Sequence, residues 1–172
     1  YMGTKIGGGM EFIASSGAIS DGTASVAFTG FDASKYDSYK FFFLNVVPVD
    51  DNSSLHSRVS VNGGGAYDST SGNYYTTQGY THIAVSGGIG GASGETTGTS
   101  GILTAFNPAY TGGYRLFHTS ETRENNSANI TRSEAANSYR GNEGTAINAI
   151  QFFMSGGNIK SGEFTMFGIV NS

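Results

Sequence analysis

The chain has 172 residues, of which 27 are glycine and 13% are aromatic, all of them tyrosine or phenylalanine, while only 13% are charged. This composition predicts strands and turns, because the Leu, Glu, Lys and Arg that long soluble helices need are scarce. The net charge of −4 excludes a general attraction to nucleic acid phosphates, and the lack of cysteine excludes disulfides and thiolate metal sites. No apolar run approaches the roughly 18 residues of a membrane span, so we expect none.

Glycine-rich and apolar stretches alternate along the first part of the chain. Residues 1–9 predict a flexible N-terminal segment, and residues 10–172 a single domain. Apolar, β-branched and aromatic residues concentrate in four segments, which we predict to be strands: 10–14, 23–31, 39–49 and 55–61. In the last of these, Leu55 and Val59 alternate with His56 and Arg58, which predicts one face against the core and the other in solvent.

The second part of the chain alternates long polar loops with short strands. Strands are predicted at 80–86, 102–106 and 114–119, and one more around Ile130. The connecting segments 62–79 and 87–101 are rich in Gly, Ser and Thr, and loops of that length are often functional. Residues 120–144 carry most of the charged side chains in a polar background, which predicts an exposed loop around the Ile130 strand.

The last two apolar segments, near residues 150–154 and 164–169, predict a closing β-hairpin around a Gly/Asn/Ser turn. Their apolar residues occupy both faces, since Phe153 points away from Phe152, and Phe167 and Ile169 point away from Phe164. An antiparallel sheet normally leaves one face in water, so we expect a second subunit to cover the other one. Phe153, Phe167 and Ile169 are therefore predicted oligomer contacts.

About eight to ten short strands with glycine-rich turns predict an all-β fold, an antiparallel β-sandwich of jelly-roll-like topology. A closed barrel is the alternative. No internal sequence repeat is visible, which disfavours propellers and solenoids.

Tests for catalysis and metal binding give no specific pattern, so we predict no enzyme, no cofactor and no metal site. The glycine tract from Gly87 lacks the lysine and the helix of a phosphate loop, and the segment from Asp50 lacks the Gly and Glu of an EF-hand. An irregular calcium site involving Asp50, Asp51 or Asp68 stays open. His56, His82 and His118 lack ligand spacing. The glutamates cluster in the charged loop instead of on core strands, and there is no Gly-x-Ser-x-Gly elbow.

Tyrosines lie in or beside the long loops among Asn, Asp, Ser and Thr. Flat apolar rings combined with adaptable hydrogen-bonding groups suit sugar recognition, whereas the ordinary alternative is that the rings anchor their own loops. Tyr74 and Tyr75 form the best pair, because adjacent side chains on an extended segment point in opposite directions and one of them is left exposed. The predicted ligand-binding residues are Tyr67, Tyr74, Tyr75, Tyr110 and Tyr114.

Residues 155–169, Ser-Gly-Gly-Asn-Ile-Lys-Ser-Gly-Glu-Phe-Thr-Met-Phe-Gly-Ile, resemble the C-terminal end of many bacteriophage virion proteins, which have a similar Ser-Gly-Asn-Ile-x-Ser-Gly-x-Phe-x-Leu-Tyr-Gly pattern. A second resemblance covers residues 36–50, 55–61 and 63–67, a strand, an Asn-Val-x-Pro turn and a Gly-rich turn before a loop tyrosine. Phe167 stands where the family usually has Tyr, and residues 87–145 have no counterpart. The resembling proteins include tail-fibre, spike and capsid-decoration proteins, especially of marine phages.

The resemblance implies a non-enzymatic structural protein on the exterior of a phage particle, in a tail fibre, an appendage or a capsid decoration. It also implies a homo-oligomer, with a trimer as the favoured form, in contact with other virion proteins. A carbohydrate-binding or host-receptor adhesin domain that uses the tyrosine loops, with a host-surface glycan as partner, is the alternative. A polysaccharide-degrading enzyme is the second alternative.

Overall fold

The computed structural model describes residues 9–77, 82–91 and 97–170. Within them the chain forms eleven strands and one short 3-10 turn, η1 (Ser71–Asn73). The strands are β1 (Met10–Ser15), β2 (Ser25–Phe28), β3 (Tyr36–Pro48), β4 (Ser53–Ser60), β5 (Tyr74–Thr76), β6 (Ile83–Ile89), β7 (Thr99–Phe106), β8 (Arg115–Glu124), β9 (Ile130–Tyr139), β10 (Ala149–Met154) and β11 (Ile159–Val170).

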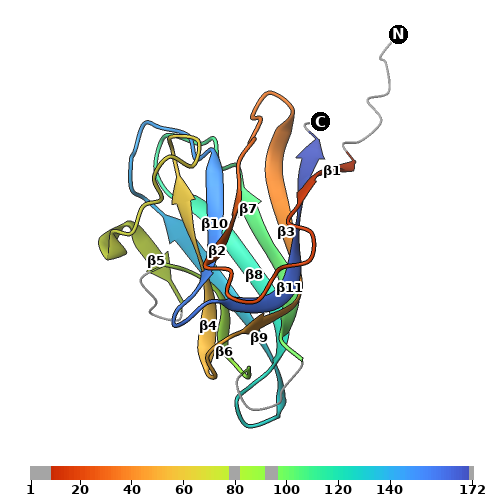
Figure 1. The fold of residues 1–172 in the computed structure, drawn as a ribbon. Coiled ribbons are helices and arrows are strands. Elements are labelled where there is room, and N and C mark those ends of the chain that lie inside the picture. The colour runs from red at the N-terminus through yellow and green to blue at the C-terminus, as the bar shows by residue number, and fades with distance from the viewer. Residues whose placement is uncertain (1–8, 78–81, 92–96, 171–172) are drawn as a thin grey trace.

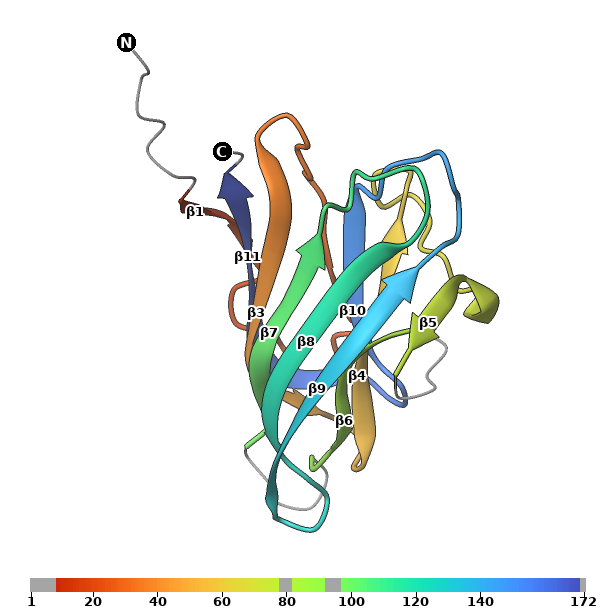
Figure 2. The same cartoon turned by 180° about the vertical axis from the view of Figure 1, so that it is seen from behind.

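The strands form two antiparallel sheets of unequal size that face each other. The larger sheet has seven strands in the order β1-β11-β3-β7-β8-β9-β5, and the smaller has four in the order β2-β10-β4-β6. Figure 1 shows the smaller sheet in front, and Figure 2, seen from behind, shows the larger sheet curving across the molecule. The prediction of an all-β sandwich is confirmed, with slightly more strands than the eight to ten expected.

One apolar core fills the space between the sheets, because each sheet turns alternate residues inward. Along β3 the inward residues Tyr39, Phe41 and Phe43 are almost completely buried. Across the core, Phe152 of β10 lies 5.6 Å from Phe41 between ring centroids, and 4.7 Å from Phe164 of β11, with stacked rings. Such aromatic contacts hold the two sheets together.

The predicted closing hairpin is wrong. β10 lies in the smaller sheet between β2 and β4, whereas β11 lies in the larger sheet between β1 and β3. Residues 155–158 therefore carry the chain from one sheet to the other, and Phe152 and Phe164 meet across the core instead of along a shared ladder. Each strand is apolar on its inner face because both inner faces contact the same interior. A short turn between two apolar strands is compatible with either connection, so the sequence pattern did not distinguish them.

The exposed loop expected over residues 120–144 is also wrong. β8 continues to Glu124 and β9 begins at Ile130, so only a tight turn separates these two long strands. Several of their inward positions hold polar residues, such as Thr119, Glu121 and Asn137, which are buried beside Phe117 and Tyr139. The inward positions from Glu121 to Asn137 carry no large apolar residue, so this segment lacked the usual sequence pattern of a strand.

Other observed strand boundaries differ from the predicted ones by a few residues. β2 is shorter than expected, β3 begins at Tyr36 instead of residue 39, and β6 extends through Gly87 and Gly88, which the sequence assigned to a loop. β5 occurs inside the expected 62–79 loop. Segments 1–8, 78–81 and 92–96 lie outside the described residues, so the flexible N-terminus stays a prediction. Within the described residues, no helix has the length and apolar character that crossing a membrane requires.

Candidate functional site

An apolar surface covers the outward side of the larger sheet on strands β1, β11, β3 and β7. We define the apolar sheet face by five residues: Phe12, Phe42, Leu44, Ile102 and Phe167. Phe12 is opposite Phe167 in the register, and Phe42 is opposite Ile102. The rings of Phe12 and Phe42 lie 5.9 and 5.4 Å from that of Phe167, both edge-on. Phe12 is 61% exposed and Leu44 63%, so the surface is open to solvent.

A groove of about 550 Å³ runs over this face, and all members of the face except Phe12 line it, together with Thr165, Thr122 and Glu163. The face exists because β3 carries apolar residues at successive positions, so that Phe41 and Phe43 enter the core while Phe42 and Leu44 point outward. Ile169 lies on the same side of β11 as Phe167, opposite Met10, which is 49% exposed.

Phe153 does not join this surface. It lies on the outer side of β10 in the smaller sheet, opposite His56 of β4. Its ring packs edge-on against His82 at 5.1 Å and against His56 at 5.9 Å, and the Arg58 guanidinium lies 4.8 Å from the ring centroid. Of the three predicted oligomer contacts, the structure therefore brings together Phe167 and Ile169 and places Phe153 on the other sheet.

The outer side of β4 is not a simple solvent face, contrary to the sequence expectation. His56 is only 7% exposed and stacks 6.0 Å from His82. Burial, with a smaller contribution from His82, lowers the pKa of His56 to about 4, and burial also lowers the pKa of His82. His118 lies on the outward side of the larger sheet, so the three histidines do not come together. No group of three or more potential metal ligands forms among the described residues.

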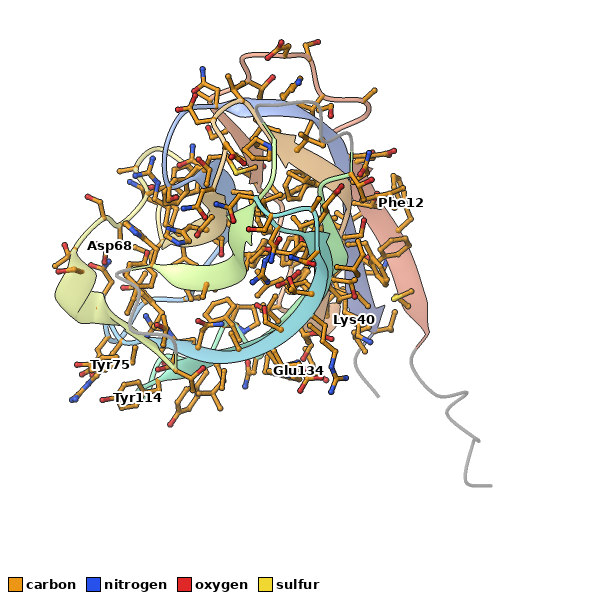
Figure 3. The ribbon with its side chains drawn as sticks, turned by 90° about the horizontal axis from the view of Figure 1, so that it is seen from below. Phe12, Lys40, Asp68, Tyr75, Tyr114 and Glu134 are labelled. Carbon is orange, nitrogen blue, oxygen red and sulfur yellow. The ribbon has the colours of Figure 1, made fainter. Side chains whose placement is uncertain are left out.

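The tyrosines separate into buried and exposed positions. Tyr74 is 4% exposed, and its hydroxyl donates to the Asp68 carbonyl, whereas Tyr75 is 49% exposed on the opposite side of β5. The ring of Tyr75 lies edge-on to Tyr114, 5.4 Å between centroids, and the guanidinium of Arg140 lies 5.3 Å from the Tyr114 ring. Figure 3 shows Tyr75 and Tyr114 together on the side of the molecule that also carries Asp68. The exposed tyrosine pair is thus Tyr75 and Tyr114, not Tyr74 and Tyr75.

The other two predicted tyrosines lie elsewhere. Tyr110 is 48% exposed in the turn before β8, where its hydroxyl is so close to Gly112 that a Cβ there would lie 2.7 Å from it. Tyr67 is partly buried in a polar cleft of about 350 Å³ between the end of β4, the following loop and the turn after β9. We call this the Asp68 cleft; it is lined by Val59, Ser60, Val61, Asn62, Ala66, Tyr67, Asp68, Thr70, Asn73 and Asn142.

Hydrogen bonds hold the Asp68 carboxylate in a fixed orientation. Its Oδ2 accepts from the Tyr139 hydroxyl at 2.7 Å and from Asn73 Nδ2 at 2.6 Å, and its Oδ1 accepts from the Thr70 amide at 2.8 Å. Burial alone would raise the pKa of Asp68, but these bonds favour the charged form and together lower it. Burial also raises the pKa of Tyr139, to about 12. Asp68 is therefore a fixed negative charge at neutral pH.

A second polar cluster lies inside the sandwich, and the sequence analysis did not predict it. The Glu121 carboxylate is completely enclosed and pairs with Arg123 and the Ser133 hydroxyl, while its Oε2 accepts from Thr99 at 3.1 Å. Nearby, Asn137 contacts both backbone groups of Ala84 at the edge of β6. The Asn137 bonds join the two sheets, whereas the Glu121 bonds link β7, β8 and β9 within the larger sheet. The residues of β8 alternate between buried and exposed in the structure, but no alternation of apolar and polar residues in the sequence could have revealed this beyond Thr119.

Comparisons with protein-family models, curated proteins and solved structures found no match for this chain. The surfaces described above are therefore the basis for a functional assignment. Two of them are accessible to a partner: the apolar sheet face, and the end of the molecule with the exposed tyrosines and the Asp68 cleft. The Glu121 cluster is enclosed, which fits a structural role.

Proposed function

We propose that this protein is a non-enzymatic structural subunit that assembles with copies of itself through the apolar sheet face, on the exterior of a phage particle. The exposed aromatic groove on the larger sheet is the observation that carries the proposal. Single exposed apolar residues are common on protein surfaces, but a contiguous apolar patch more often marks an interaction site. The resemblance of residues 155–169 to phage virion C-termini supports the location in a tail fibre, an appendage or a capsid decoration.

The charges around the face suit a second copy of the chain as its occupant. Lys40 lies opposite Phe167 in the register, and Glu163 lies opposite Leu44, four residues further along β3. Four residues of a strand span about 13 Å, so a rotated neighbour can place its glutamate beside this lysine without separating the apolar residues. Such a contact joins the Lys40 end of the face on one copy to the Glu163 end of the face on the next. With a rotation of one third of a turn between copies it closes into a ring, the trimer implied by the resemblance.

The test is the mass of the purified chain in solution, measured by light scattering or native mass spectrometry. We expect three times the mass of the single chain, and dissociation to monomer in the double variant Phe42→Ser/Phe167→Ser. Ile130→Ser is the matched control, because Ile130 is 68% exposed but lies outside the face. Circular dichroism confirms that the variants stay folded. A monomeric wild-type protein at tens of micromolar would overturn the proposal.

Glycan recognition is a second candidate function, favoured by the exposed Tyr75 and Tyr114 beside Arg140 and Glu143. Arg140 Nε lies 2.5 Å from Glu143 Oε1, so charged hydrogen-bonding groups adjoin the two rings. Aromatic rings next to such groups suit sugars, which combine apolar faces with hydroxyl edges. On a glycan array we expect hits that Tyr75→Ala and Tyr114→Ala remove and that Tyr110→Ala retains. An array without hits would exclude this candidate.

A further inference from the structure

The Asp68 cleft combines a suitable size with hydrogen-bonding groups that the described residues leave unused. Its volume of about 350 Å³ falls at the lower end of the range for small-molecule sites, about 300 to 1,000 Å³. Its walls include apolar groups, such as Val59, Val61 and the ring of Tyr67, but most of its lining is polar. Cavities with a few convergent polar groups are the usual form of a ligand site.

A chain of hydrogen bonds fixes the direction in which the cleft amides point. Tyr139 donates its hydroxyl proton to Asp68 and accepts at 2.9 Å from Asn142 Nδ2. Asn73 also donates to Asp68. Since both nitrogens are committed as donors, the amide oxygens of Asn73 and Asn142 remain as acceptors, and neither has a hydrogen-bond partner among the described residues.

In Asn62 the amide oxygen is the committed atom, whereas in Asn73 and Asn142 it is the amide nitrogen. Its Oδ1 accepts from the Ser60 hydroxyl at 2.7 Å and from the Ala66 amide at 2.9 Å, so its amide nitrogen remains as a donor. The Tyr67 hydroxyl is also free to bind a ligand, since it makes no hydrogen bond to any described residue. It lies so close to Gly64 that a Cβ there would be 2.9 Å away, and the positive φ of Gly64, 89°, further restricts that position to glycine. The loop therefore holds the tyrosine hydroxyl in place.

The cleft thus offers two amide oxygens as acceptors, the N–H groups that the three amide nitrogens leave unused as donors, and one hydroxyl that both donates and accepts. A hydroxyl group matches such a mixture, because it donates one hydrogen bond and accepts others. Among the described residues that line the cleft, Asp68 is the one with a formal charge, which disfavours an anion. A calcium ion needs about six to eight oxygen ligands, whereas the Asp68 oxygens already accept three hydrogen bonds. With an anion disfavoured and the Asp68 oxygens already engaged, the ligand class that fits this cleft is a neutral molecule with several hydroxyl groups.

We propose that the Asp68 cleft binds a neutral monosaccharide unit, free or at the end of a glycan chain, through the Tyr67 hydroxyl and the amides of Asn62, Asn73 and Asn142. The site extends the second candidate function to different residues, because the exposed Tyr75 and Tyr114 do not line the cleft. It is independent of assembly through the apolar sheet face.

The test is saturation-transfer NMR on the full chain with a panel of neutral sugars and their methyl glycosides, covering hexoses, 6-deoxyhexoses and N-acetylhexosamines. We expect binding in the millimolar range, with shifts in the side-chain amide signals of Asn62, Asn73 and Asn142. Tyr67→Phe removes only a hydroxyl without a described partner, so the protein should unfold at the same temperature. It should bind the sugar about threefold to tenfold more weakly, the value of one neutral hydrogen bond.

Three comparisons make the result decisive. Asn142→Ala should weaken binding by a similar factor, whereas Tyr110→Phe, which removes a tyrosine hydroxyl outside the cleft, should leave it unchanged. Binding of a methyl glycoside would identify the end of a glycan chain as an acceptable ligand, and binding of only the free sugar would restrict the site to monosaccharides. The proposal is overturned if no panel sugar binds, if only sialic acid or calcium chloride perturbs the cleft signals, or if Tyr75→Ala and Tyr114→Ala abolish sugar binding that Tyr67→Phe leaves intact.

Discussion

The two halves of the larger sheet use the same strand geometry but expose different chemistry. In one cross-strand row, Phe42 of β3 is opposite Ile102 of β7, and Ile102 is opposite Ser120 of β8, which in turn is opposite Glu134 of β9. In this row the outward side changes from apolar to polar between β7 and β8, although Phe106 of β7 and Leu116 of β8 form an exposed apolar pair near one end of these strands. Figure 3 shows the two ends of this surface, with Phe12 and Lys40 on one side and Tyr114 and Tyr75 on the other, and Glu134 between them.

The inner faces of the two halves also differ. β3 and β11 turn phenylalanines into the core, whereas β8 and β9 turn Thr119, Glu121 and Asn137 inward. The apolar half is therefore stabilised mainly by packing and also exposes apolar residues on its outer face. The polar half combines the packing of Phe117 and Tyr139 with buried hydrogen bonds. On our proposal, the outward positions of the apolar half serve assembly, while the inward positions of both halves serve the contact between the two sheets.

The most damaging substitution should be one that breaks the buried pair of the polar half. Arg123→Ala leaves the enclosed Glu121 carboxylate without its cationic partner, so we expect a loss of about 3–5 kcal/mol in the free energy of unfolding, measured with urea. The double variant Glu121→Leu/Arg123→Met replaces the pair with apolar groups and should recover most of the loss. Equal stability of Arg123→Ala and wild type would contradict the structural role of the pair.

The next effect concerns pH and the outer side of the smaller sheet. The pKa of His56 falls from 6.5 to about 4 on folding, so between these values the unfolded chain binds a proton that the folded protein does not. Stability should therefore decrease as the pH falls from about 6.5 to 4, by about 3 kcal/mol in total from this group. His56→Gln should flatten this part of the pH profile. The same slope in both proteins would show that His56 is not the cause.

A smaller effect tests the support of the Asp68 cleft. Tyr139→Phe removes the hydroxyl that donates to Asp68, at a cost of about 1–2 kcal/mol in unfolding free energy. The pKa of Asp68 should rise, because the charged form loses a hydrogen bond, and the acid-induced loss of stability that comes from Asp68 should become smaller and end at a higher pH. NMR titration of the carboxyl carbon measures the shift. Tyr110→Phe, at an exposed tyrosine outside the cleft, should change neither quantity.

Sequence reasoning identified the residues of the apolar face only in part. Phe167 and Ile169 stood out because they alternate with Phe164 along one strand, whereas Phe12, Phe42 and Leu44 looked like ordinary strand residues. Their outward direction depends on which neighbours of β3 enter the core, and the opposing sheet sets that choice.

Of the residues that line the Asp68 cleft, the sequence analysis singled out Tyr67 and, for a different role in an irregular calcium site, Asp68. Tyr67 was identified as a ligand-binding candidate from its place beside a long loop. The amides that accompany it, those of Asn62 and Asn142, come from loops that are far apart in the sequence and meet only in the folded chain. No local pattern could have joined them.

Local composition and a two-residue period are sufficient to establish that the chain is built of strands and that alternate residues on most of them enter a core. Which sheet each strand joins depends instead on contacts between distant segments. β10 and β11 illustrate the reason, since a short turn between two apolar strands allows them either to pair or to face each other across the core. The contact between Phe152 and Phe164 shows the second arrangement. Distant contacts also decide the charged segment that forms β8 and β9, because their buried polar groups find partners on the neighbouring strands and on β6 of the opposing sheet.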